Sequence, residues 1–315
     1  MTIPALAVID FHTHHLVAGL TPAPTDRLPD ALRAHWNTIN AKLVDEAALL
    51  ADIESGDLAA RVVNTPTALL ADPDGAVLPG AIARINDRLA ALAQRHPGRI
   101  HALATIDAFS GDAGARELLR AVNDLGLRGA FIESAKGEIL LDAPQARPTL
   151  QAAADLGIPL FVHPVNPEGL TRQLSGYGRL GTLLARGTIN AVSLVALIGS
   201  GTLEELPRLN IVVTTLAIGT ILLTAPFGKD GQRDANALLR RQVYVDTMGF
   251  HPALIRAAID VLGIEHVVAG SDWPIVSTGP IGPRLADALK SIGLNEREQN
   301  LIASGNTLRL LSGRQ

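Results

Sequence analysis

The chain contains no cysteine among its 315 residues. Disulfide bonds and thiolate metal sites are therefore excluded, and any bound metal ion must be held by histidine and carboxylate side chains. Hydrophobic residues make up 47% of the chain and charged residues only 18%. That composition and length allow a large buried core, in one large α/β domain or in two domains.

Positive charge is also scarce. The formal net charge is −4, and no cluster of basic residues overrides that average. Nucleic acid is therefore not an expected partner. The N-terminal segment MTIPALAVID has neither a basic region nor an apolar core before a cleavage site, so we expect a cytoplasmic rather than a secreted protein.

Long uncharged runs are limited to residues 187–203 and 209–228. Each approaches the ~20 residues that a membrane span needs. The second run contains four threonines, and a Pro-Arg-Leu-Asn turn at 207–210 separates it from the first. We therefore expect a buried helix followed by a buried strand, and no membrane partner.

Short apolar runs recur along the chain, each followed by a polar tip and usually by a stretch with helical spacing of apolar residues. Their nearly continuous Val, Ile, Leu and Ala content is typical of parallel strands that are buried on both faces. The predicted strands are Ala5–Phe11, Ala60–Thr65, Ile100–Asp107, Leu127–Glu133, Ile158–His163, Asn210–Leu216, Val243–Thr247 and His266–Ser271. The clearest predicted helices are Ala81–Arg95, Ala113–Leu125, Gln145–Leu156 and Pro252–Leu262.

Eight such units in about 270 residues match the usual size of a (β/α)8, or TIM, barrel of the α/β class. An open doubly wound sheet is the alternative, but no Gly-x-Gly-x-x-Gly motif follows any strand. No linker rich in Pro, Gly or Ser divides the chain, so residues 1–315 are predicted to form one domain. The segment from Leu16 to about Asn40 is interpreted as a lid-like loop inserted after the first strand, and a C-terminal helix is expected near Glu296–Leu311.

Polar residues at the ends of the first, fifth and eighth strands predict a metal site. His12 and His14 follow the first strand, His163 ends the fifth, and Asp272 follows the eighth. The carboxyl ends of all barrel strands emerge at one face, and alternation puts His12 and His14 on the same side of the chain. Three imidazoles and one carboxylate are a complete ligand set for one divalent ion with room for a water. Zinc is favoured, and manganese is the alternative.

The order and spacing of several segments resemble the amidohydrolase superfamily. The likeness is to its amidohydrolase-related branch, which includes aminocarboxymuconate-semialdehyde decarboxylase and related aromatic-acid decarboxylases and hydrolases. The segments are DFHTH, PLFVHP, LPRLNIVV, VAGSDWP and NEREQNLIASGNTLRLL, which together span almost the whole chain. The resemblance implies zinc or a similar ion held by His12, His14, His163 and Asp272, with a bound water.

The sixth strand departs from that branch, in which it normally ends in a histidine followed two residues later by glycine. Here Thr215 and Ala217 stand in those places, and no histidine lies between His163 and His251. A threonine hydroxyl has no useful proton affinity near neutral pH, so it cannot replace an imidazole as general acid or base. The departure puts proton transfer in question, but not the metal site.

Three explanations fit this departure. Asp272 alone shuttles the proton, or His251, in the loop after the seventh strand, has taken over, or the protein binds a metal and a ligand without turnover. We favour Asp272, because activation of water by the metal is the largest single contribution expected at such a site.

Further polar or aromatic residues near the strand ends are candidates for substrate binding. Lys136 and Arg172 are placed to hold a substrate carboxylate, the arginine bidentately. Asp246 on the seventh strand is a further pocket-lining candidate. The predicted substrate-binding set is Asn64, Glu133, Lys136, Arg172, Thr215 and Trp273.

We therefore expect a metal-dependent hydrolase that acts on a small carboxylated ring, lactone or amide through metal-activated water. The first alternative is a non-oxidative decarboxylase of an aromatic or enamine carboxylic acid. The second is a metal-dependent small-molecule binder without turnover. The sequence does not determine the oligomeric state, and a homodimer is possible; its expected interface is the uncharged helix at 187–203, whose apolar stripe needs cover.

Overall fold

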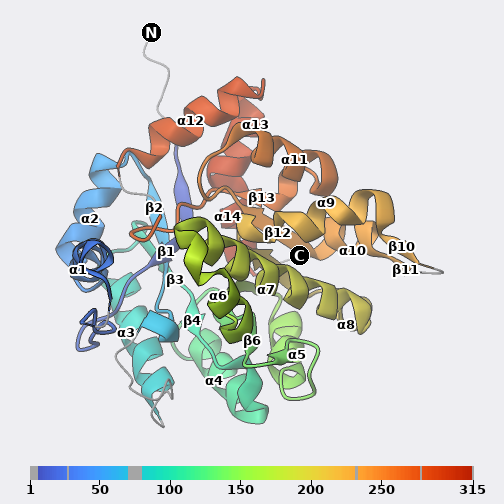
Figure 1. Ribbon diagram of the computed structural model, residues 1–315, viewed down its shortest axis with the longest axis horizontal. Helices are drawn as coiled ribbons and strands as arrows, with labels where there is room; N and C mark the ends of the chain where they lie inside the picture. The colour runs from blue at the N-terminus through green and yellow to red at the C-terminus, as the bar shows by residue number, and fades with distance from the viewer. Residues whose placement is uncertain (1–5, 27, 70–79, 231–232, 277–278, 314–315) are drawn as a thin grey trace.

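The computed structural model describes residues 6–26, 28–69, 80–230, 233–276 and 279–313. Parallel strands form a central barrel and follow one another in the order of the chain (Figure 1), which confirms the predicted (β/α)8 architecture. The barrel strands are β1 (Ile9–His14), β2 (Ala60–Asn64), β3 (Ile100–Ala102) with β4 (Ala104–Thr105), β5 (Ala130–Glu133), β8 (Pro159–His163), β9 (Asn210–Val213), β12 (Val243–Asp246) and β13 (Val267–Val268).

The strands divide into two sheets that backbone hydrogen bonds join at both edges. The sheet orders are β1-β2-β3 and β13-β12-β9-β8-β5-β4. At one junction only Leu103 separates β3 from β4, and its amide donates to the carbonyl of Val63 at 2.9 Å. At the other, the amides of Phe11 and His14 donate at 2.8 Å to carbonyls that follow β13. The first strand therefore lies beside the last.

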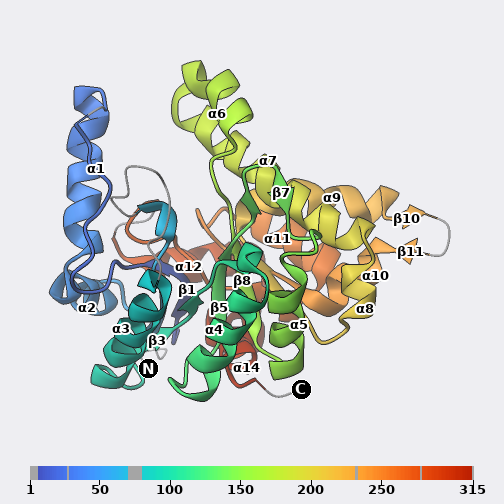
Figure 2. The ribbon, with the colours of Figure 1, turned by 90° about the horizontal axis from the view of Figure 1, so that it is seen from below.

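Helices cover the outside of the barrel (Figures 1 and 2). They are α2 (Glu46–Ser55), α3 (Ala81–Arg95), α4 (Asp112–Asn123), α5 (Arg147–Leu156), α7 (Gly178–Gly199), α8 (Thr202–Glu205), α9 (Ile218–Phe227), α10 (Ala235–Gln242), α11 (Pro252–Leu262) and α12 (Ile281–Ser291). Two small hairpins lie outside the barrel, β6 (Ala135–Lys136) with β7 (Ile139–Leu140) and β10 (Lys229–Asp230) with β11 (Arg233–Asp234).

The segment predicted as a lid-like loop is partly helical. It contains α1 (Asp30–Leu43), and Leu16, Ile39 and Leu43 form a small buried cluster separate from the main core. Figure 2 shows α1 and α6 (Glu168–Leu174) rising on the same side of the molecule. Since they follow β1 and β8, that side carries the carboxyl ends of the strands.

Strands β9 and β13 are shorter than the sequence pattern predicted, because groups outside the backbone ladder of the sheet bond to the backbone where they end. Strand β9 stops at Val213, since the amide of Thr215 donates to a carboxylate oxygen of Asp246. The chain then turns into a 3₁₀ turn at Thr215–Ala217, so the run that was expected to be strand to Leu216 becomes helical. The first strand is shifted, beginning at Ile9 and continuing to His14, while Ala5 lies outside the described residues.

Strand β13 ends at Val268 for a related reason. The amide of Ala269 donates at 3.0 Å to the carbonyl of Ile302. That residue lies in a π-helical turn, Leu301–Gly305, between α13 (Glu296–Asn300) and α14 (Asn306–Leu311). A π turn leaves carbonyls without their usual partner within the helix. The carbonyl of Ile302 is therefore free to accept the amide of Ala269, which follows β13.

Helix α7 is part of the one helical run, Glu168–Gly199, that is long and apolar enough to cross a membrane by length and composition alone. Its inner face packs against the barrel, with Ala185, Leu194 and Leu197 buried. The outer face exposes Leu184 and Val195. The helix is therefore a wall of the barrel, and the homodimer expected through it stays a prediction.

A buried ionic network ties β1 to β2 and to the segment after β13. The guanidinium of Arg61, which is fully buried, donates to Asp10 at 2.9 Å and to Asp52 at 2.5 Å. It also lies 4.8 Å from the centre of the Trp273 ring. Asp10 in turn accepts the amide of Ser271 at 2.9 Å and its hydroxyl at 2.6 Å.

Replacement of Arg61 by methionine should therefore destabilise the fold strongly. The methionine fills much of the space, but leaves Asp10 as a buried charge without its counter-ion, which costs about 3–5 kcal/mol. Urea denaturation monitored by circular dichroism measures the change. The matched control is Arg208→Met, which breaks an exposed pair with Asp155 and should cost less than about 1 kcal/mol. Equal losses in the two variants would contradict the role of the network.

Candidate metal centre

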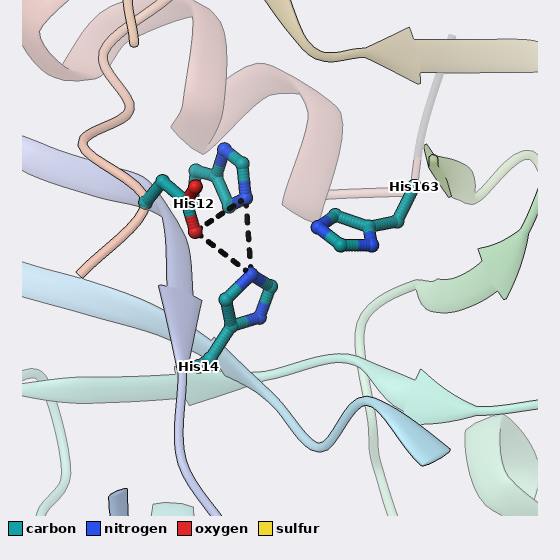
Figure 3. Close-up of side chains that lie close together, drawn as sticks. His12, His14 and His163 are labelled. Carbon is teal, nitrogen blue, oxygen red and sulfur yellow. Dashed lines mark hydrogen bonds and ion pairs between the residues drawn. The ribbon is translucent and has the colours of Figure 1, made fainter. Parts of the chain in front are cut away.

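Four buried side chains converge at the carboxyl ends of β1 and β8 and just after β13. One ligand atom from each of His12, His14, His163 and Asp272 lies within 4.8 Å of the other three. Figure 3 shows His12 and His14 side by side on β1, with the ring of His163 facing them across a common space. The four residues predicted as metal ligands are thus brought together.

The atoms that face the centre are acceptors that lack donors. The Nε2 atoms of His12 and His14 are 3.2 Å apart. Oδ1 of Asp272 lies 3.1 Å from Nε2 of His14 and 3.4 Å from that of His12, and it is buried without a hydrogen-bond partner. Such an inward-facing set of nitrogen and oxygen lone pairs fits a divalent cation.

The outer nitrogens of the two β1 histidines are fixed from behind. Nδ1 of His12 lies 2.6 Å from Oδ2 of Asp246, and Nδ1 of His14 lies 2.7 Å from Oδ1 of Asn64. A proton on each Nδ1 satisfies these contacts and leaves the Nε2 lone pairs for a metal. Asn64, predicted to bind substrate, and Asp246, predicted to line the pocket, therefore orient metal ligands.

Thr215 holds Asp246 in place. Its amide donates at 2.8 Å to Oδ1 of Asp246, the oxygen that does not contact His12, and its hydroxyl lies 2.8 Å from the same oxygen and 2.5 Å from the backbone carbonyl oxygen of Asp246. The residue predicted to bind substrate, at the place of the expected histidine, thus fixes the carboxylate that orients His12. No sequence pattern signals this role, because it depends on hydrogen bonds between the ends of the neighbouring strands β9 and β12.

Gly270 permits the close approach of these groups. A Cβ at this position would lie 2.8 Å from Cβ of Asp246 and 3.0 Å from Cβ of His12. Contacts this short force a displacement, so a larger residue would separate the carboxylate from the imidazole. The glycine before Ser271-Asp272 is therefore a requirement of the site.

Electrostatics favour the charge states that metal binding needs at Asp272 and His163, whereas at His12 they favour the protonated form, whose proton a bound ion would displace. Burial alone would raise the pKa of Asp272, but His12 and His14 lower it below its usual value. Burial, with help from His14, holds the pKa of His163 well below its usual value. For His12, burial lowers the pKa, but the carboxylates of Asp272 and Asp246 raise it overall. Asp272 is thus ionised and His163 neutral near pH 7, as ligands must be.

The backbone of Asp272 is itself unusual. Its φ of 58° lies in the left-handed region, which non-glycine residues rarely adopt, although aspartate is among the more tolerant types. The turn aims the carboxylate back toward His12 and His14 on β1, a few residues after β13 ends.

Arg186, on the inner face of α7, was not among the predicted residues. One guanidinium nitrogen lies 3.4 Å from Nε2 of His163, and another donates to Oδ1 of Asn166 at 3.3 Å. Burial lowers its pKa, while Asp272 and Glu133 raise it. Arg186 lies in mid-helix, so no pattern at a strand end pointed to it.

Glu133 ends β5, the strand next to β8, and pairs in register with His163. Its Oε2 is buried without a hydrogen-bond partner, and its Oε1 accepts from Thr67 at 3.4 Å. Burial raises the pKa of Glu133 to about 7, although Arg186 and Thr67 oppose the shift. This candidate therefore lies beside the metal ligands, as predicted.

Three other predicted substrate-binding residues are occupied elsewhere. Lys136 pairs with Asp107 at 2.7 Å, and its side chain is 60% exposed. Arg172 pairs with Glu168 on α6. Trp273 is fully buried against Arg61. The contacts of these three residues are therefore with residues other than the four ligands.

His251, the predicted substitute base, precedes α11 and is exposed. It borders a small hollow that Thr215 and Asp246 also line. None of the four ligand residues lines that hollow. His251 is therefore on the correct face of the barrel, but it faces the groups that support His12 rather than the centre.

The chain is similar in sequence to known proteins over most of its length. The amidohydrolase family profile matches residues 9–313. Gamma-resorcylate decarboxylase of Rhizobium sp. is 26% identical over 299 residues, which cover 88% of this chain and 90% of the relative. The 2-amino-3-carboxymuconate-6-semialdehyde decarboxylase of Dictyostelium discoideum is 23% identical over 241 residues, 72% of this chain and 65% of that protein.

A solved structure supports the fold and shows a metal. The dihydroxybenzoic acid decarboxylase of Polaromonas sp., with bound manganese and the inhibitor 2-nitroresorcinol, superposes with a TM-score of 0.79 at 21% identity. The match covers 98% of each chain. A metal in this relative is consistent with the buried His and Asp group, and it leaves zinc as one choice beside manganese.

Protein purified without chelator should contain about one divalent ion per chain. The double substitution His12→Ala, His14→Ala removes two of the four ligands and should abolish the stoichiometric metal measured by mass spectrometry. A His251→Ala variant is the control and should keep its metal. If the double variant is folded by circular dichroism and still carries one ion per chain, the ligand assignment is wrong.

Glu133→Gln should change the pH dependence of stability in metal-free protein. The folded-state pKa of about 7 lies above the usual 4.5, so the folded state binds the proton more tightly than the unfolded state does. The wild type therefore loses stability as pH rises through that window, by up to roughly 3 kcal/mol. Glutamine cannot ionise, so the unfolding free energy of the variant minus that of the wild type should rise across the window in urea titrations. A difference that does not vary with pH would contradict the shifted pKa.

Proposed function

The chain belongs to the amidohydrolase family, and from this premise we propose that it is a metal-dependent, non-oxidative decarboxylase of an aromatic or closely related carboxylic acid. The observation that supports this proposal is the similarity to gamma-resorcylate decarboxylase of Rhizobium sp., which covers 88% of this chain. The hydrolase expected from the sequence is thereby displaced by its first alternative. Both activities use the same kind of ligand set, so the ligands alone do not distinguish them.

The residues present fit a divalent ion, and His12, His14, His163 and Asp272 would hold it. Bound there, the ion would act as a Lewis acid on substrate oxygen atoms next to it. The fit rests on the buried, unpartnered Oδ1 of Asp272 and on the Nε2 atoms that face it. Asp246 and Asn64 keep those imidazoles in the tautomer that ligation needs.

The reaction requires one proton at carbon. In a non-oxidative decarboxylation, a proton adds to the carbon that bears the carboxylate, the bond to the carboxylate breaks, and carbon dioxide leaves as the ring regains its electrons. We assign the proton shuttle to Asp272, because its carboxylate lies among the ligands, where the substrate acid would sit. Ionised at neutral pH, it would first accept a proton from a substrate hydroxyl group or a water molecule and then deliver that proton to the ring carbon. The hydroxyl of Thr215 is too weak an acid for this role, and it is bonded to Asp246.

A panel of hydroxybenzoates and lactones, with carbon dioxide and acid release both monitored, tests the class of reaction. We expect carbon dioxide from at least one hydroxybenzoate and no lactone hydrolysis. Acid release from a lactone without any carbon dioxide would instead support a hydrolase. Thermal stabilisation by a ligand without either product would indicate a binder.

Asp272→Asn should lower the decarboxylation rate by about 10²–10⁴, the usual worth of general acid–base help. The variant is assayed at saturating manganese, with the bound metal quantified, so that loss of the ion is separated from loss of the shuttle. His251→Ala is the matched comparison and should retain most of the activity. A loss of similar size in His251→Ala alone would transfer the role to His251.

A further inference from the structure

Arg186 is a cation beside the metal centre whose polar partners are both neutral. Its contacts are His163 Nε2 at 3.4 Å and Asn166 Oδ1 at 3.3 Å. Both are long for hydrogen bonds of a charged donor. Among the residues that the structure describes, no carboxylate forms an ion pair with it. The carboxylates of Asp272 and Glu133 act on Arg186 electrostatically, but in the described residues neither forms an ion pair with it, so its hydrogen-bonding fork is left for an anion that arrives from outside.

The helix that carries Arg186 is fixed with respect to the strands. Asn190, one turn further along α7, donates to the carbonyl of Val162 at 3.0 Å and accepts from the hydroxyl of Thr214 at 3.0 Å. Gly187 permits close packing, since a Cβ there would lie 2.8 Å from the carbonyl oxygen of Leu216. Residues four apart share a helix face, so the anchored Asn190 directs Arg186 toward the ends of β8 and β9.

A second incompletely bonded group lies on the neighbouring strand. Glu133 pairs in register with His163, so the two side chains emerge on the same side of the sheet. Its Oε2 is buried and has no hydrogen-bond partner, while Oε1 accepts the long contact from Thr67 and the carboxyl group also accepts a backbone hydrogen bond from Ala68. A buried carboxyl oxygen without a donor needs one from a ligand.

We propose that Arg186 binds the carboxylate of the substrate through its guanidinium fork, while Glu133 hydrogen-bonds to a hydroxyl group of the same molecule. The proposal rests on the decarboxylase function above and narrows its substrate to hydroxy-substituted ring acids. A guanidinium and a carboxylate match each other in a planar, two-bond geometry that lysine does not reproduce. Arg186 thereby takes the part that Lys136 and Arg172 were expected to play.

Binding of 2,6-dihydroxybenzoate and of its uncharged amide, 2,6-dihydroxybenzamide, to the manganese-loaded protein tests the proposal by calorimetry. The wild type should prefer the acid. Arg186→Gln should weaken binding of the acid about 10- to 100-fold, the range for hydrogen bonds to charged groups, and leave the amide nearly unchanged. Arg186→Lys should recover part of the loss. Arg208→Gln, on an exposed pair, is the matched control and should bind like the wild type.

Glu133 is tested with benzoate, which lacks the hydroxyl groups. Glu133→Ala should weaken the binding of 2,6-dihydroxybenzoate by about 10-fold and the binding of benzoate far less. An equal loss for both acids would remove Glu133 from the proposal.

Three results would overturn the role of Arg186. They are a wild type that does not prefer the acid to the amide, an Arg186→Gln variant that binds the acid as well as the wild type, and a variant that loses acid and amide equally. Metal content is measured in every variant, so that a structural effect through His163 is recognised. Failure here is distinct from failure of the proposed function. Carbon dioxide release by the wild type together with binding of the acid that does not depend on Arg186 would contradict only the assignment of the arginine, whereas Arg186-dependent binding of the acid without carbon dioxide release would contradict only the decarboxylase.

Discussion

The carboxylate of Asp10 holds the first strand of the barrel to the chain that follows the last. It accepts from the backbone and hydroxyl of Ser271 on one side and from the buried guanidinium of Arg61 on the other. It also receives the amide of His12 at 3.2 Å. Asp10 precedes two metal ligands by a few residues and Ser271 directly precedes another. A single buried charge thus fixes the distance between the histidine pair and Asp272.

Helix α7 links the barrel wall to the chemistry. The two faces of this helix differ. On the inner face Asn190 is hydrogen-bonded to the ends of two strands, while on the outer face Leu184 and Val195 are exposed. Arg186 shares the inner face and extends over His163. The apolar composition that gives this helix the hydropathy of a membrane span therefore reflects its packing against strands that are themselves apolar.

The barrel and the four ligands follow from patterns that the sequence displays. Strand runs, the alternation of His12 and His14, and the common face of parallel strand ends are local or topological rules. The roles of Asn64 and Thr215 could not be predicted, because a polar residue at a strand end either faces the pocket or supports a ligand from behind. Hydrogen bonds between strands decide which. The role of Arg186 is harder still to predict, since the position of its side chain depends on how closely Gly187 lets α7 approach Leu216.

The left-handed backbone of Asp272 has a consequence for how such a protein changes over time. Glycine adopts that conformation without the strain of roughly 1 kcal/mol or more that a side chain carries there. A change to glycine at this position relieves that strain and also removes a buried carboxylate from among the imidazoles. At this one residue the stability of the backbone therefore favours glycine, whereas the chemistry of the site requires aspartate. Only selection for activity keeps the aspartate in place, and a lineage released from that selection would lose its chemistry while its barrel remained intact.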